Sequence, residues 1–187
     1  MKKKTYIAIL RGINVSASNM IKMPVLQKIF EDAGYENVKT YIQSGNVLFN
    51  QKKSNEEEMA KHVREKIKEG TGSDVPVLVL ELEDLKKVLQ RNPFLKSRQE
   101  DITKLHVTFL VKEPEKERFE KIEIDKYLPD EFILDAKSLY LFCPNGYGKT
   151  KLHNNFFESK LKLDATTRNW KTVNELVRLG EELAAQT

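Results

Sequence analysis

Apolar and polar positions along the first half of the chain predict strands and helices in alternation. Residues 6–13 are typical of a buried strand, since positions 6–10 are all apolar, and residues 24–33 repeat apolar side chains at helical spacing. Two short strands, 38–42 and 47–49, flank Gln43-Ser44-Gly45-Asn46, a sequence typical of a hairpin in which Gly45 is expected to adopt a positive φ.

A second helix and a fourth strand complete this pattern. Ser54 and Glu57 have the spacing of a capping box, which predicts the start of a helix that continues to the glycines at 70 and 72. Residues 75–82 are apolar and predict another strand. The order β-α-β-β-α-β is that of a ferredoxin-like unit.

The second half repeats this order of elements without recognisable sequence identity to the first. Its expected elements are strand 105–111, a helix from Pro114 through Ile122, strands 131–134 and 139–142, a helix from Leu152 to Leu161, strand 165–168, and a final helix opened by a Thr172–Glu175 capping box.

These elements predict an α+β fold of two tandem ferredoxin-like modules with antiparallel sheets, plus connecting and C-terminal helices. We expect module 1 at residues 1–82 and module 2, with the C-terminal helix, at residues 105–187. Residues 83–104 are expected to form a connecting helix and a linker through Asn92-Pro93-Phe94.

Composition favours a globular protein of the cytoplasm. The chain is 40% apolar and 32% charged, and it contains no run of roughly 18 apolar residues that could span a membrane. Its one cysteine, Cys143, cannot form an internal disulfide, in agreement with a reducing compartment. Cys143 follows an apolar strand, so we expect a buried, unreactive thiol. The sequence leaves the oligomeric state open.

Positive charge is concentrated in two segments. The net charge is +4; residues 1–50 carry 7 basic and 3 acidic groups, and residues 146–171 carry 6 and 2. Both segments hold unusual polar motifs, so an anionic ligand is the simplest functional interpretation.

Those motifs lie where strands are expected to end, and loops at strand ends often carry function. Strand directions in a ferredoxin-like unit place the loop after the first strand beside the second-to-third hairpin. We therefore expect residues 11–19 to meet residues 43–46, and residues 144–149 to meet residues 168–171. The sequence does not indicate whether the two clusters form one cleft.

The loop at Asn145-Gly146-Tyr147-Gly148-Lys149 resembles a P-loop only in part. The first glycine of that motif is replaced by Cys143, and Pro144 removes an amide from the phosphate cradle, which argues against nucleotide hydrolysis. An anion nest at a helix N-terminus and a plain glycine-rich turn remain as alternatives.

Two arginines have two interpretations each. Arg11 and Arg168 both follow apolar strands, where they either anchor an anion or pair with a carboxylate; we expect them to face solvent. Trp170 either packs under the final helix or offers a stacking face beside Arg168.

Conventional catalytic chemistry has no candidate set in this sequence. The three histidines, His62, His106 and His153, lack metal-ligand spacing with Cys, Asp or Glu, so we expect no metal and no cofactor. Ser44 lacks the context of a nucleophile elbow, and no paired carboxylates end a strand.

Five ordered segments resemble one family. Residues 10–15, 41–49, 92–94, 145–152 and 167–173 read close to LRGINVGG, YIQSGNVVF, NPF, LPNGYGRSKL and TRNWRTV. These motifs are similar to those of a family of uncharacterised bacterial proteins with a domain of unknown function. The resemblance implies two ferredoxin-like modules and no established activity. The chain departs from the family pattern at Ser16 and Ala17, usually two glycines, and at Thr150, usually serine.

Three functional hypotheses follow. The first is a protein that binds a phosphate-bearing or other anionic ligand, with nucleic acid or nucleotide first. The second is a metal-free enzyme acting on a small anionic metabolite, and the third is a structural or partner-binding role. The expected ligand-binding residues are Arg11, Asn14, Gln43, Ser44, Asn46, Asn145, Lys149, Arg168, Asn169 and Trp170.

Overall fold

A computed structural model describes residues 3–15 and 19–186 of the chain. The first sheet and its helices have the predicted order. The elements are β1 (Lys3–Leu10), α1 (Met23–Asp32), β2 (Glu36–Tyr41), β3 (Asn46–Lys52), α2 (Glu56–Thr71) and β4 (Val77–Glu81). The strands pair antiparallel in the order β2-β3-β1-β4, which is the ferredoxin-like arrangement.

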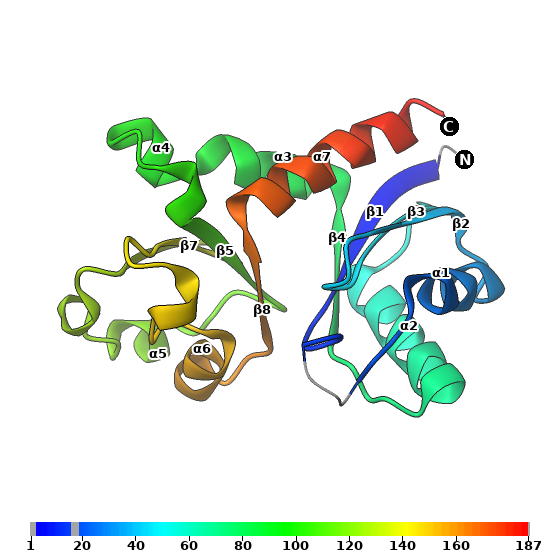
Figure 1. Cartoon of the computed structure of the whole chain (residues 1–187), viewed down its shortest axis with the longest axis horizontal. Coiled ribbons are helices and arrows are strands. Elements are labelled where there is room, and N and C mark those ends of the chain that lie inside the picture. Colours follow the sequence, from blue (N-terminus) through cyan, green and yellow to red (C-terminus); the bar gives the residue numbers. More distant parts are fainter. Residues whose placement is uncertain (1–2, 16–18, 187) are drawn as a thin grey trace. The chain divides into compact units, whose positions relative to one another are not determined.

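Helices α1 and α2 lie side by side against one face of this sheet (Figure 1). The apolar stripe of α1 buries Leu26 and Phe30, and that of α2 buries Met59, Val63 and Ile67. Phe30 packs against Phe49 of β3 with ring centroids 5.6 Å apart. This burial against the sheet holds helices of such modest length in place.

The start of α2 differs from the expected capping box. The N-cap is Asn55, whose Oδ1 accepts hydrogen bonds from the backbone N–H groups of Glu57 and Glu58. Ser54 instead donates its backbone N–H to the hydroxyl of Tyr6. The prediction of a Ser54–Glu57 box is therefore wrong, because Asn55 caps as well as serine and sits directly before the first helical residue.

The second sheet confirms the repeated topology. Its elements are β5 (Leu105–Leu110), α5 (Lys116–Glu120), β6 (Glu131–Asp135), β7 (Ser138–Phe142), α6 (Asn154–Leu161) and β8 (Ala165–Asn169). The antiparallel strand order is β6-β7-β5-β8. Leu110, Phe132, Leu141, Phe157 and Leu161 are among the residues that form its core with the helices. The predicted α+β class with two four-stranded antiparallel sheets is confirmed.

The segment after the first sheet is more ordered than a linker. Helix α3 (Leu82–Arg91) is followed at once by α4 (Pro93–Ser97). Asn92 caps α4 through its side chain, and Phe94 is only 2% exposed. The segment contains a short helix that the sequence did not predict, because Asn92 and Pro93 start one.

The chain divides into two compact units. Unit 1 comprises Met1–Lys86 and Glu175–Thr187, and unit 2 comprises Lys87–Asn174. The C-terminal helix α7 (Trp170–Ala184) contributes residues to both ranges. The sequence-based division at residues 82 and 105 stays a prediction.

Candidate functional site

The first predicted cluster forms at one end of the first sheet. The backbone N–H of Leu10, the last residue of β1, donates to the carbonyl of Gly45 in the β2–β3 turn at 2.8 Å. The side chain of Asn14 donates to the carbonyl of Gln43 at 2.9 Å. The expected meeting of the loop after β1 with the hairpin is therefore confirmed.

Asn14 is the residue that shapes this loop. It adopts φ +56, a conformation that asparagine tolerates. Its Oδ1 accepts from the Ile21 backbone N–H at 2.8 Å, and its Nδ2 donates to the Ile21 carbonyl at 2.9 Å. With the bond to Gln43, the Asn14 amide is occupied by the fold itself.

The Asn46 side chain of the β2–β3 turn is likewise hydrogen-bonded within the fold. Asn46 is fully buried, and its Nδ2 donates to the Tyr41 carbonyl at 3.0 Å and to Ser44 Oγ at 3.1 Å. Gly45 has φ +80, as its expected positive φ requires. Gln43, in contrast, is exposed, and no polar partner of its side chain occurs among the described residues.

Arg11 lies half-buried beside this hairpin, and its backbone N–H donates to the Pro76 carbonyl at 3.0 Å. Ser16 and Ala17, where the chain departs from the family motif, lie outside the described residues.

The second predicted cluster forms at the end of the second sheet. His106 of β5 is the register partner of Asn169 in β8. The His106 ring stacks on Tyr147 of the glycine-rich loop, with centroids 4.7 Å apart and planes inclined by 24°. Asn169 and the loop at residues 145–149 are thus brought together, as predicted from the strand directions.

His106 is the residue that sequence reasoning missed. It is 9% exposed, its Nδ1 has no hydrogen-bond partner, and burial lowers its pKa, partly opposed by a hydrogen bond with the Lys104 backbone. A single histidine within the apolar strand Leu105–Leu110 was the available signal.

The glycine-rich loop is a compact turn that does not open a long helix. Gly146, at φ +90, donates its N–H to the Cys143 carbonyl at 2.9 Å, and Lys149 donates its N–H to the Gly146 carbonyl at 3.1 Å. Residues Tyr147–Lys149 form one 3-10 turn, and α6 begins only at Asn154, capped by His153. Of the two alternatives that the sequence left open, this geometry favours the glycine-rich turn over a nest at the N-terminus of α6.

The outward-facing groups of this loop are side chains. Asn145 and Lys149 are exposed, and neither side chain has a polar partner within the described ranges. A methyl group added at Gly146 or Gly148 would meet no atom within 4 Å. The loop therefore presents an amide and an ammonium group over open space.

The Arg168 side chain lies on the face of β8 that points away from the helices of the second sheet. Thr167 bonds to Thr108 and to Asn154 of α6, so its side chain faces the helices and that of Arg168 faces away from them. Arg168 is only 8% exposed, donates to the Thr167 carbonyl at 2.9 Å, and has its pKa lowered to about 10 by burial, with Tyr147 opposing this shift. The expectation of a solvent-facing Arg168 is wrong.

The start of α7 accounts for two more predicted residues. Asn169 Oδ1 accepts from the Thr172 backbone N–H at 2.7 Å, so Asn169 caps the helix and the Thr172–Glu175 box is not formed. Trp170 is 4% exposed, as a packed aromatic would be. Its role in ligand binding, like that of Asn169 and Arg168, stays a prediction.

Cys143 is a core residue, as expected. It is fully buried, and desolvation raises the pKa of its thiol to about 11. A thiol with such a pKa is protonated and weakly nucleophilic near neutral pH.

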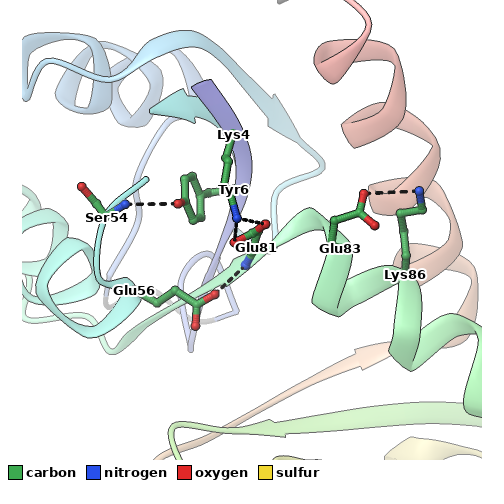
Figure 2. Close-up of polar contacts among 7 residues, drawn as sticks. All are labelled: Lys4, Tyr6, Ser54, Glu56, Glu81, Glu83 and Lys86. Carbon is green, nitrogen blue, oxygen red and sulfur yellow. Dashed lines mark hydrogen bonds and ion pairs between the residues drawn. The ribbon is translucent and has the colours of Figure 1, made fainter. Parts of the chain in front are cut away.

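A hollow of about 360 Å³ lies at the other end of β1, lined in part by Lys4, Glu81 and Glu83. Figure 2 shows why its charges are already satisfied: Lys4 Nζ donates to both carboxylate oxygens of Glu81, at 2.6 and 2.8 Å, and Lys86 lies 3.4 Å from Glu83. Glu56 accepts from the Glu81 backbone N–H. Lys4 and Lys86 are therefore already paired with carboxylates, and neither is free to bind an anion in this hollow.

Metal and membrane features are absent from the described part of the chain. No group of three or more His, Cys, Asp or Glu side chains in residues 3–15 and 19–186 is placed to hold a metal ion. Within the same residues, no helix is both long and apolar enough to cross a bilayer.

The comparisons identify a family and a fold. The family model described as Protein of unknown function (DUF1697) matches residues 3–140. The structure of conserved bacterial protein SP0830 from Streptococcus pneumoniae is similar with a TM-score of 0.67 and 23% sequence identity, over 95% of this chain and 99% of that one. No curated protein matches the chain. Because the family model spans most of the sequence, the chain belongs to the DUF1697 family of proteins of unknown function.

Proposed function

We propose that this protein binds a phosphate-bearing ligand, nucleotides and nucleic acid first, at the end of the second sheet. The loop at residues 145–149 and the His106–Tyr147 ring pair form the proposed site. The proposal leaves the first cluster aside, because the side chains of Asn14 and Asn46 are already occupied by the fold.

The charge of this segment supports an anion. Residues 146–171 carry six basic and two acidic residues. The five lysines among them are exposed, and none forms an ion pair with any described residue: Lys149, Lys151, Lys160, Lys162 and Lys171. Unpaired ammonium groups in one segment attract phosphate without first breaking an internal contact.

The observation that carries the proposal is the arrangement at Asn145 and Lys149. Both side chains leave a tight turn, face solvent, and lack an internal polar partner among the described residues. An ammonium supplies charge, and an amide supplies both a donor and an acceptor. The open space at Gly146 and Gly148 leaves room for a ligand near the backbone.

The ring pair supports a phosphate ligand that also carries a flat ring. Tyr147 is half-buried with one face on His106. Stacking of a base on an aromatic side chain contributes about 1–3 kcal/mol. A nucleotide would engage Lys149 through its phosphate and Tyr147 through its base, whereas inorganic phosphate would engage Lys149 alone.

Isothermal titration with AMP and with inorganic phosphate at low salt tests this proposal. Lys149→Ala should weaken AMP binding about tenfold, because a hydrogen bond to a charged group contributes about 1.5–3 kcal/mol. Lys160→Ala is the matched control: it removes the same exposed charge near the end of α6, outside the loop at residues 145–149, and should weaken AMP binding far less than Lys149→Ala.

Two results would refute the proposal. One is the absence of measurable binding of AMP, phosphate and single-stranded oligonucleotides at low salt. The other is equal weakening by both lysine substitutions, which would indicate nonspecific attraction by net charge. An oligonucleotide that binds more tightly than AMP, with a steep salt dependence, would identify nucleic acid as the ligand.

One observation favours the enzymatic alternative. His106 is a buried titratable group with an unpartnered ring nitrogen beside the proposed site, and groups with shifted pKa values concentrate at functional sites. In that case the chain would convert a small phosphate ester without metal. Phosphorus NMR of a phosphate-ester panel tests this, since turnover should vanish in His106→Gln, and no turnover in the wild type would reject it.

We place this function in the cytoplasm. The one cysteine is an unpaired, buried thiol, which a reducing compartment preserves. Fractionation of cells that produce the native protein tests this, and recovery outside the cytoplasm would contradict it.

A further inference from the structure

Three large aliphatic side chains are exposed around the loop that follows β1. Val15 is 78% exposed, Met20 66% and Ile42 45%. Singly exposed apolar residues are common, but several gathered at one place mark an interaction surface.

Asn14 holds these three residues at one end of the first sheet. Its side chain bonds to Ile21 and to Gln43, which directly follow Met20 and Ile42, and Val15 follows Asn14 itself. The Asn14 side chain thus links the three segments that carry the exposed side chains. We call Val15, Met20 and Ile42 the aliphatic surface; these hydrogen bonds hold its three segments together.

The backbone of Ile42 is strained. It has φ +50, a left-handed conformation that is an outlier for a β-branched residue. Such strain costs about 1–3 kcal/mol and persists mainly at functional sites. Here the strained residue presents a large apolar side chain that is 45% exposed to solvent.

The sequence around the aliphatic surface is basic. Residues 11–30 contain Arg11, Lys22 and Lys28 and no acidic residue, and Lys39 precedes Ile42 by three positions, although Lys28 is paired with Asp32. Lys22 is exposed beside Ile21 and forms no ion pair with the described residues. The surface therefore combines apolar contact with positive charge.

We propose that the aliphatic surface of unit 1 docks a segment of a partner protein that carries apolar and acidic side chains. Apolar partner residues would cover Val15, Met20 and Ile42, and carboxylates would face Lys22. This role is independent of the phosphate site proposed for unit 2, because it uses none of the same residues.

The chemistry of the surface favours this occupant over others. Nucleic acid and membrane surfaces are generally met by aromatic side chains, and none of the three exposed residues of the aliphatic surface is aromatic. A second copy of the surface would bring like charges together. Methionine and branched aliphatic side chains suit an adaptable protein contact.

The test selects short peptides from a random phage-displayed library on the immobilised full chain and measures the selected peptides by fluorescence anisotropy. Selected peptides should be rich in Asp or Glu together with Leu, Ile or Phe. Met20→Ser and Ile42→Asn should each weaken their binding about tenfold, as truncation of an interface residue that contributes about 1.4 kcal/mol would.

Ile42→Asn distinguishes a binding role of Ile42 from a structural one, because stability and peptide binding should change in opposite directions. Asparagine tolerates φ +50, so the substitution should raise the urea midpoint while it weakens the peptide. Ile133→Asn is the matched control, because Ile133 is 42% exposed on β6, and it should leave peptide binding unchanged.

Four results would overturn the proposal: no peptide is enriched, the enriched peptides lack acidic residues, Met20→Ser and Ile42→Asn bind them as the wild type does, or Ile133→Asn weakens them equally. Loss of a homodimer, or of binding to phosphatidylserine vesicles, as the sole effect of Ile42→Asn would also overturn it, because the occupant would then be a second copy or a membrane.

Discussion

Replacing Gly45 with alanine tests how the first strand-end loop is packed. Gly45 has φ +80, and a Cβ built there would lie 2.6 Å from Ile13 Cδ1 and 2.9 Å from Leu10 Cβ. Leu10 and Ile13 are both buried, so neither can move into solvent. Two separate effects therefore oppose the methyl group.

Their magnitudes can be estimated separately. A left-handed alanine costs about 1–2 kcal/mol, and one extra methyl in a filled core costs about 1–3 kcal/mol. The alanine also reduces the conformational freedom of the unfolded chain, which offsets about 0.4–1 kcal/mol of this loss. Gly45→Ala should therefore lower the free energy of unfolding by about 1–5 kcal/mol.

Gly12→Ala is the matched control in the same loop. Gly12 has φ +71, but a Cβ there would meet no atom within 4 Å. Only the cost of the left-handed backbone and the opposing effect of a less flexible unfolded chain remain. The free energy of unfolding should therefore fall by about 1 kcal/mol or less. Urea unfolding followed by circular dichroism gives both values. Equal losses in the two variants would refute the packing argument.

Other predictions concern unit 2. Asn169→Ala should cost about 1 kcal/mol in urea unfolding, since it removes the cap of α7; no change would mean that this bond does not stabilise the helix start. Arg168→Ala should cost about 1–3 kcal/mol, because it removes a buried guanidinium and its hydrogen bond to the Thr167 carbonyl; a loss near zero would show that Arg168 does not stabilise the fold. Burial lowers the pKa of His106 in the folded state below the unfolded value of ~6.5. The stabilisation that neutral His106 gives the folded state is therefore complete above pH ~6.5 and is lost as the pH falls below that value. Urea midpoints of wild type and His106→Gln should converge on acidification, and parallel pH curves would contradict this. Cys143 should react with a thiol reagent at neutral pH only after unfolding, and rapid labelling of the folded protein would show an accessible thiolate.

The order of elements could be predicted because apolar spacing alone determines it. The run before Arg11 is buried as β1, and the positive φ expected at Gly45 is present. Strand directions then correctly brought the predicted loops together in pairs. These are consequences of local pattern and chain topology, which need no knowledge of particular side-chain contacts.

The uses of the polar side chains could not be predicted in the same way. Asn14 and Asn46 looked like ligand-reading amides, but their partners, the Ile21 and Tyr41 backbones among them, depend on the closed shape of the loops. His106 gained its significance from Tyr147, which is distant in sequence. Capping was misassigned at Ser54 because adjacent residues compete for the same amides.

The most direct test of the phosphate site is a nitrogen–proton NMR titration of the full chain with AMP at low salt. The largest chemical-shift changes should occur at the Gly146 and Gly148 amides and at the Asn145 side-chain amide, with smaller changes at Arg11 and Gln43. Lys149→Ala should remove these changes, and Lys160→Ala should not. Shifts that are absent, or largest around Arg11, would contradict the account.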